Sequence, residues 1–225
     1  MQKITIFLCV LISFTFIGYV VTPSATLFQI GLSVERNIAR LTLNKITLSE
    51  GDIVYLEGGK GQTLLLVHGF GGNKDNWTRL ARHLTSNYHV IAVDLPGFGD
   101  SFKNMHLDYD LSAQVARLNE FVNRLELNSF HLAGNSMGGY IAGNYAATFP
   151  DSMLSLWLLN PLGVAEAPPS EMFTMIRENK RPVVLVKTKS EYQQLLTYVF
   201  HQRPYIPDLF ITELAKQAQK NFPLH

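Results

Sequence analysis

The stretch that most constrains this chain is a G-x-S-x-G motif at 134–138, which follows an apolar run and opens a helical pattern at 137–148. A strand that turns sharply into a helix through a serine holds that serine in a strained backbone conformation, and only small residues fit beside it. Gly134 and Gly138 meet this requirement. The N-terminus of the following helix directs free N–H groups toward any oxyanion formed beside the hydroxyl. The motif therefore predicts a nucleophilic Ser136, and the alternative is an ordinary Gly-Ser turn.

Strand and helix patterns alternate along the chain around this motif. Continuous apolar runs predict buried strands, apolar residues at helical spacing predict the helices between them, and a Gly-Asp turn signal predicts a hairpin ahead of them. Strands that alternate with helices of this length form βαβ units and a mostly parallel sheet with helices on both faces. The expected strands are 41–48, 53–56, 63–67, 90–93, 130–133 and 154–159, and helices are expected near Asn76, at 111–125 and at 137–148.

The composition excludes several classes of protein. Hydrophobic types make up 47% of the 225 residues and charged types 16%, which suits one sizeable core with an appended lid. The net charge is +1 with the signs interspersed, so no nucleic-acid partner is predicted. The single cysteine, Cys9, excludes an internal disulfide framework. The glycine-rich stretches lack the spacing of nucleotide-binding loops, and neither a metal nor a cofactor is predicted.

The N-terminal run at 4–22 carries no charge, follows Lys3 and ends at Pro23. At about 1.5 Å per helical residue, it matches the roughly 30 Å hydrocarbon core of a bilayer. Residues 1–23 are therefore predicted to form an uncleaved, single-pass transmembrane anchor, with the rest of the chain on the non-cytoplasmic side. A cleaved signal peptide is the alternative, because it also begins with a positive charge before an apolar stretch.

The remainder of the chain divides into three predicted parts. Residues 24–40 are expected to form a tether or juxtamembrane helix, and residues 41–160 the α/β core. Residues 161–225 are expected to form a helical cap or lid after the sixth strand, because a Ser-x-x-Gln capping box at 190–193 and Pro207 mark helix starts there.

Taken in order, these motifs resemble the α/β-hydrolase family, and its membrane-anchored lipase and monoacylglycerol-lipase-like branch is most similar. The segment H-G-F-G-G at 68–72 resembles the family's oxyanion loop, and D-L-P-G-F-G-D-S at 94–101 resembles the turn after its fourth strand. The segment G-N-S-M-G-G at 134–139 resembles its nucleophile turn, and the helical stretch at 187–207 resembles its cap.

In that family two backbone N–H groups hold the oxyanion. The resemblance assigns these groups to Phe70 and Met137. It also implies that His68 is structural, because this fold supplies its base after the serine in chain order. Asp94 and Ser101 are expected to stabilise their turn, with Asp94 accepting backbone N–H groups.

The resemblance is incomplete where a base and an acid are expected, since a nucleophilic serine needs both. Downstream of Ser136 the sequence offers His201, which falls in the predicted lid helix, and His225, the last residue. Asp151 occupies an expected helix end, and Asn160 stands where some relatives carry the acid. Because the family's sheet continues past the cap with two more strands, the chain is predicted to be a fragment that lacks them.

The function implied is that of a serine carboxylic-ester hydrolase, lipase-like or monoacylglycerol-lipase-like, acting on lipid esters at a membrane through an acyl-enzyme on Ser136. The chain as given is expected to be inactive. Two alternatives stay open. One is a non-catalytic binding protein that keeps the pocket, and the other is a different α/β-hydrolase chemistry such as C–C hydrolysis.

Overall fold

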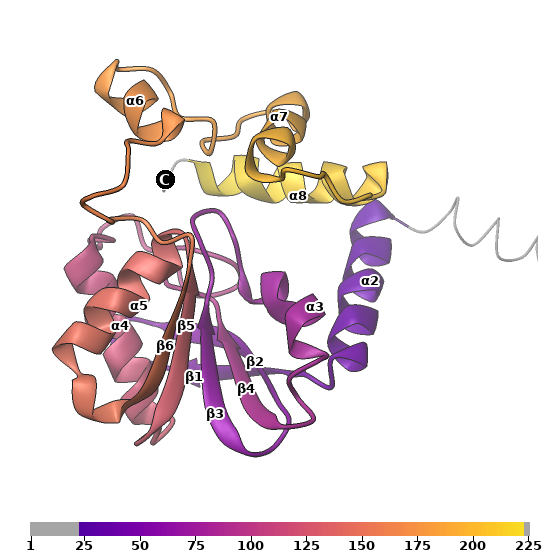
Figure 1. The fold of residues 1–225 in the computed structure, drawn as a ribbon. Coiled ribbons are helices and arrows are strands. Elements are labelled where there is room, and N and C mark those ends of the chain that lie inside the picture. Colours follow the sequence, from indigo (N-terminus) through magenta and orange to yellow (C-terminus); the bar gives the residue numbers. More distant parts are fainter. Residues whose placement is uncertain (1–22, 223–225) are drawn as a thin grey trace, which may run out of the picture.

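The computed structural model describes residues 23–222 and has a six-stranded sheet at its centre (Figure 1). The strands are β1 (Thr42–Thr47), β2 (Asp52–Gly58), β3 (Gln62–Val67), β4 (Tyr88–Val93), β5 (Phe130–Asn135) and β6 (Met153–Leu159). Their order is β1-β2-β4-β3-β5-β6. The β3, β4, β5 and β6 strands are mutually parallel, whereas β2 pairs antiparallel with both β1 and β4. The predicted mostly parallel sheet with a leading hairpin is confirmed.

Helices cover both faces of this sheet and one of its ends (Figure 1). They are α2 (Ser24–Ile38), α3 (Thr78–Ala81), α4 (Leu111–Arg124), α5 (Met137–Thr148), α6 (Glu171–Arg177), α7 (Lys189–Val199) and α8 (Asp208–Asn221), with short 3-10 helices η1 (Lys74–Trp77) and η2 (Pro150–Ser152). The helix expected near Asn76 is thus shorter than its apolar spacing indicates. It consists of η1, capped by the Asn73 side chain, followed by one α-helical turn.

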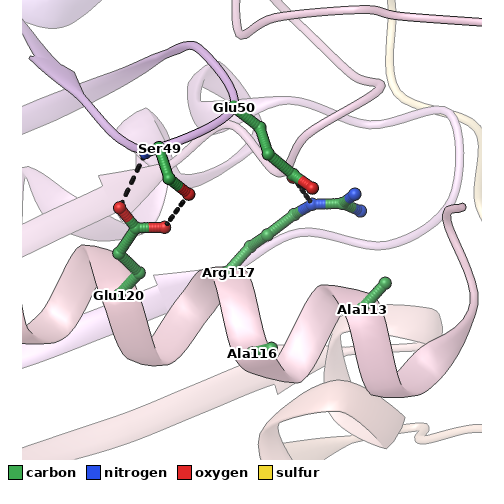
Figure 2. A pocket seen from close by; sticks show the side chains of 6 residues that line it. All are labelled: Ser49, Glu50, Ala113, Ala116, Arg117 and Glu120. Atoms are coloured by element: carbon green, nitrogen blue, oxygen red, sulfur yellow. Dashed lines mark hydrogen bonds and ion pairs between the residues drawn. The ribbon is translucent and has the colours of Figure 1, made fainter. Parts of the chain in front are cut away.

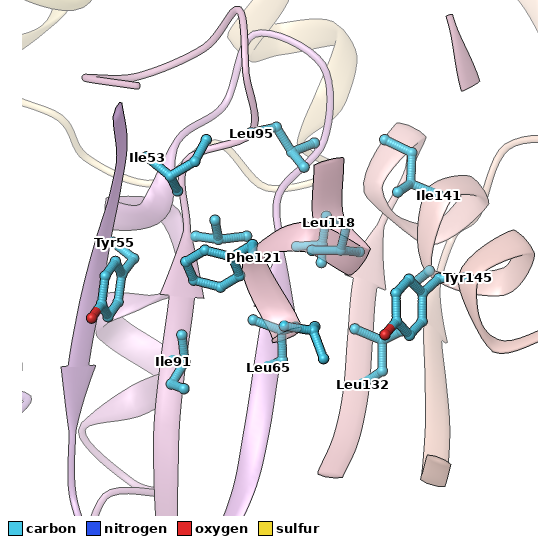
Figure 3. Packing of buried hydrophobic residues seen from close by; sticks show 14 of the residues in the cluster. Ile53, Tyr55, Leu65, Ile91, Leu95, Leu118, Phe121, Leu132, Ile141 and Tyr145 are labelled. Carbon is cyan, nitrogen blue, oxygen red and sulfur yellow. The ribbon is translucent and has the colours of Figure 1, made fainter. Parts of the chain in front are cut away.

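Alternation along the strands divides the core between the two faces. Leu65, Ile91 and Leu132 face α4 and α5, where they pack with Phe121 and Tyr145 (Figure 3). The neighbouring strand residues belong to a second cluster on the face of α3, which contains Leu64, Leu66, Trp77, Ala81, Val90, Ala92 and Ala133. Successive strand side chains point to opposite faces, so both faces of β3, β4 and β5 are buried.

The segment predicted as a tether is helical, and it packs on the cap. The Phe28 ring of α2 meets the Phe210 ring of α8 edge-on, with centroids 5.5 Å apart. The Ser24 hydroxyl donates to the Glu213 carboxylate at 2.6 Å. Residues 1–22 of the predicted anchor lie outside the described residues. Within residues 23–222, no helix combines the length and hydropathy needed to span a bilayer.

The cap helices begin and end at slightly different residues from those predicted. The capping box of α7 is formed by Thr188 and Glu191, two positions before the expected Ser-x-x-Gln pair. The Glu191 carboxylate also accepts the Lys187 N–H at 2.6 Å, and a charged acceptor is stronger than a Gln amide. The α7 helix ends at Val199, so His201 lies beyond it rather than inside it. The start of α8 directly after its Pro N-cap agrees with the prediction.

Candidate active site

The turn between β5 and α5 has the strained geometry that the motif predicts. Ser136 has φ 53° and ψ −117°, a left-handed φ that non-glycine residues rarely adopt. Its N–H donates to the Leu159 carbonyl at 3.0 Å, and its own carbonyl accepts the N–H groups of Tyr140 and Leu162 at 3.1 Å each. The end of β6 and the first turn of α5 therefore hold the serine in this conformation.

The flanking glycines allow three segments to approach each other closely. A Cβ on Gly134 would lie 2.2 Å from the Gly138 carbonyl oxygen. A Cβ on Gly138 would lie 2.3 Å from the His68 carbonyl oxygen and 2.4 Å from that of Val67. No side chain fits at such distances, so β5, α5 and the end of β3 can meet only through glycine.

The loop after β3 lies directly against the serine. A Cβ on Gly69 would be 3.1 Å from the Ser136 Cβ, and a turn bond from the Gly72 N–H to the Gly69 carbonyl, 3.0 Å long, shapes the loop. The half-buried Phe70 ring packs edge-on against Phe98, with centroids 5.6 Å apart. The half-buried Met137 is the first residue of α5. The structure thus brings together the segments that carry the three predicted site residues.

His68 is buried, and both of its ring nitrogens face the backbone. Nε2 accepts the Leu95 N–H at 3.1 Å, so Nδ1 carries the proton and donates to the Gly69 carbonyl at 2.7 Å. Burial lowers the pKa of the imidazole below its ordinary value, which keeps the ring neutral. His68 holds the loop to the turn after β4, which is the structural role expected of it.

This buried neutral imidazole predicts that stability falls as the pH drops below about 6.5. Below this pH the His68 ring takes up a proton in the unfolded state but stays neutral in the folded state. The contribution of His68 to the free energy of unfolding is therefore complete above the ordinary pKa, and it is lost as the pH falls toward the lower folded pKa. We expect the free energy of unfolding to fall by up to about 1.4 kcal/mol per pH unit as the pH drops below about 6.5. Urea unfolding at several pH values measures this slope. His68→Gln should flatten it, and an unchanged slope in the variant would assign the effect to another group.

Asp94 organises the turn after β4, as predicted. Its carboxylate is fully buried and accepts the backbone N–H of Lys74 at 2.6 Å and that of Asp100 at 2.7 Å. The Ser101 hydroxyl donates to the Asp94 carbonyl at 2.7 Å and accepts the Val54 N–H at 2.9 Å. The Lys74 ammonium lies 2.8 Å from the same carboxylate. No sequence pattern predicts that this lysine is buried.

The described residues show no hydrogen bond between a candidate base and the serine. Across residues 23–222, no hydrogen bond joins a histidine ring to Ser136. His201 is exposed in the bend after α7, Asp151 is exposed in η2, and Asn160 is exposed after β6. In the same range, no three His, Cys, Asp or Glu side chains are grouped so that they could hold a metal ion.

A small surface pocket of about 170 Å³ lies elsewhere, between α4 and the turn that joins β1 to β2 (Figure 2). Glu120 accepts bonds of 2.7 Å from the N–H and the hydroxyl of Ser49, and Arg117 pairs with Glu50. Its lining contains none of the predicted site residues. The candidate chemistry therefore belongs to the serine turn and not to this pocket.

Residues 62–206 match the family model described as alpha/beta hydrolase fold, and the chain belongs to this family. It is 41% identical over 195 residues to Lipase 1 of Psychrobacter immobilis. This alignment covers 84% of this chain and 61% of that protein. The chain is 34% identical over 157 residues to the monoacylglycerol lipase ABHD6 of Homo sapiens, covering 65% of this chain and 47% of that protein.

A solved structure is also similar over nearly the whole chain. It is that of a membrane phospholipase A, described as a bacterial virulence factor, with a TM-score of 0.87 and 40% identity over 99% of this chain and 72% of the other. The chain therefore spans 61%, 47% and 72% of the lengths of these three proteins.

Proposed function

We propose that this protein is a serine carboxylic-ester hydrolase that acts on lipid esters such as acylglycerols. The observation that carries the proposal is the left-handed Ser136 between β5 and α5, packed against the loop that contains Phe70. The lipase names of its relatives support the choice of lipid esters.

In the proposed reaction the Ser136 hydroxyl loses its proton to a base and attacks the ester carbonyl. The oxyanion accepts the backbone N–H groups of Phe70 and Met137. The Met137 N–H lies in the first turn of α5, where no intrahelical acceptor exists for it. The alcohol leaves with the proton from the base, and water then hydrolyses the acyl-enzyme. A single oxyanion donor contributes about 3 kcal/mol to such transition states.

We propose that the base and the acid come from strands that extend the sheet beyond β6 in a longer form of the protein. β6 is an edge strand with exposed apolar side chains on both of its faces, Leu154, Leu156 and Leu158 on one and Trp157 on the other. An uncharged apolar edge of this kind is a template for further strand pairing. The greater length of the relatives supports this proposal.

Substrate comparison in such a longer form tests the reaction class. We expect release of fatty acid from a monoacylglycerol and no cleavage of a vinylogous 1,5-diketone, the kind of substrate that C–C hydrolysis requires. Preferential cleavage of the diketone would replace the ester assignment. A folded protein that binds monoacylglycerol without hydrolysing it would favour the non-catalytic binding protein.

We also propose that residues 1–23 attach the protein to a membrane, with its catalytic domain on the non-cytoplasmic side. The uncharged sequence at 4–22 and the similarity to a membrane phospholipase support this assignment. The protein should stay with membranes through an alkaline wash, because an apolar segment of this length gains far more from lipid than surface charges contribute. Recovery of soluble protein that starts after Thr22 would instead indicate a cleaved signal peptide.

A further inference from the structure

A buried ion pair joins α2 to the start of η1. The Arg36 guanidinium donates two hydrogen bonds to the Asp75 carboxylate, from Nε to Oδ1 at 2.6 Å and from Nη2 to Oδ2 at 2.7 Å. The two side chains are only 12% and 9% exposed. A bidentate Arg–carboxylate pair fixes the orientation of the two groups as well as their distance. The pair therefore holds α2 against Asp75, the residue that follows Lys74.

The ion pair continues into a cluster of charged side chains around the buried Lys74 ammonium. Asp75 Oδ2 lies 3.7 Å from the Lys74 ammonium, which itself bonds Asp94 at 2.8 Å and Asp100 at 2.6 Å. Arg36 and Lys74 thus face three carboxylates. The Lys103 ammonium, near Asp100, bonds the Gly99 carbonyl at 2.5 Å.

The turn after β4 holds both ends of the loop at 68–74. At its start, the His68 ring accepts the Leu95 N–H, and at its end the Lys74 N–H donates to Asp94. Both anchors lie in the turn after β4. Phe70 lies in the chain between these two anchors, and the second anchor holds Lys74 on Asp94.

We propose that Arg36 is a positioning residue for the oxyanion loop, acting through Asp75 and Lys74. This inference rests on the proposed ester hydrolysis at Ser136. Without Arg36, the nearly buried Asp75 carboxylate keeps Lys74 as its ion-pair partner and draws the ammonium away from Asp94. The end of the loop then shifts, and the Phe70 N–H no longer meets the oxyanion at hydrogen-bonding distance.

Kinetic measurements on the longer form of the protein, which carries the proposed base and acid, test this role. Arg36→Ala should lower kcat roughly ten- to a hundredfold with little change in KM, because the displaced N–H group acts in the transition state. Arg36→Lys should recover only part of the loss, since an ammonium cannot form the fork. Arg79→Ala is the matched control, because that side chain is 66% exposed and lies 3.6 Å from Glu35.

The double variant Arg36→Ala with Asp75→Asn separates positioning from general support of the fold. Removing the competing carboxylate should leave Lys74 on Asp94 and restore most of kcat. If the double variant is as slow as Arg36→Ala, or if Arg36→Ala changes KM alone, the proposed path through Asp75 and Lys74 is wrong.

Amide hydrogen exchange in the full chain decides the same point without any catalysis. Arg36→Ala should speed exchange at 69–76 and leave the strand amides unchanged, whereas Arg79→Ala should alter neither. Unchanged exchange at 69–76, or an equal increase throughout the sheet, would overturn the positioning role. If no variant hydrolyses esters while the exchange result holds, the proposed function fails and the coupling of α2 to the loop stands.

Discussion

Replacing Ser136 with alanine is expected to reduce monoacylglycerol hydrolysis by about 10³-fold or more in a form that carries the proposed base and acid. The variant lacks the attacking oxygen, and the oxyanion donors alone cannot form an acyl-enzyme. Alanine has the same Cβ at φ 53°, so the strain in the turn and the melting temperature should change little. Fatty-acid release and thermal unfolding, measured on the same preparations, separate loss of chemistry from loss of folding.

Ser155→Ala provides the control for this experiment. Ser155 also lies at the β5–β6 pair, where its hydroxyl bonds the His131 ring at 2.8 Å, and it is exposed. Its replacement should leave kcat unchanged. A Ser136→Ala enzyme that keeps more than about a tenth of the activity would contradict a serine nucleophile. Removing a true nucleophile lowers the rate by far more than tenfold.

The second large effect concerns folding. Lys74→Met is expected to lower the free energy of unfolding by about 3–5 kcal/mol, since it leaves the carboxylate of Asp94 buried without its cation. The Lys74 side chain is 1% exposed, and that of Asp94 is 0% exposed. Urea unfolding followed by tryptophan fluorescence measures the loss.

Two further variants test whether burial of the ion pair causes this loss of stability. Lys45→Met removes an ion pair of similar length, 2.7 Å to Asp52, but the two side chains are 62% and 41% exposed. Solvent screens such a pair, so the unfolding midpoint should hardly move. Adding Asp94→Asn to Lys74→Met should recover part of the stability. Equal midpoints for Lys74→Met and Lys45→Met would show that burial does not strengthen the pair.

The sheet and the serine turn were predictable because their signals are local. Apolar runs at 63–67 and 90–93 lie within β3 and β4, and both strands are buried on both faces. The glycines at 134 and 138 reflect steric limits that any strand-to-helix serine turn imposes. Local sequence therefore predicts both the fold and the strained serine turn.

The ion pairs around the oxyanion loop were not predictable, because they join distant parts of the chain. Arg36 and Asp75 are 39 positions apart, and Lys74 is 20 positions from Asp94. A lysine in a polar loop gives no sign that it will be buried, since most lysines are exposed.

The start of α7 shows a different limit of local sequence. Thr188 with Glu191 and Ser190 with Gln193 both fit the capping-box pattern. Only the extra bonds that the Glu191 carboxylate accepts, from the Lys187 N–H and the Arg181 side chain, favour the earlier pair. When two sequence patterns fit equally well, contacts outside both patterns determine where the helix starts.

Covalent labelling with a fluorophosphonate probe, with the modified residue located by mass spectrometry, tests the central claim most directly. The probe reacts with a serine only when a base activates it and an oxyanion site stabilises the adduct. We expect weak or absent labelling of the 225-residue chain, and stoichiometric labelling at Ser136 in a form extended by the strands proposed to pair with β6. Robust labelling of the 225-residue chain at Ser136 would show that a base is already present, and an extended, folded protein that stays unlabelled would contradict the serine hydrolase assignment.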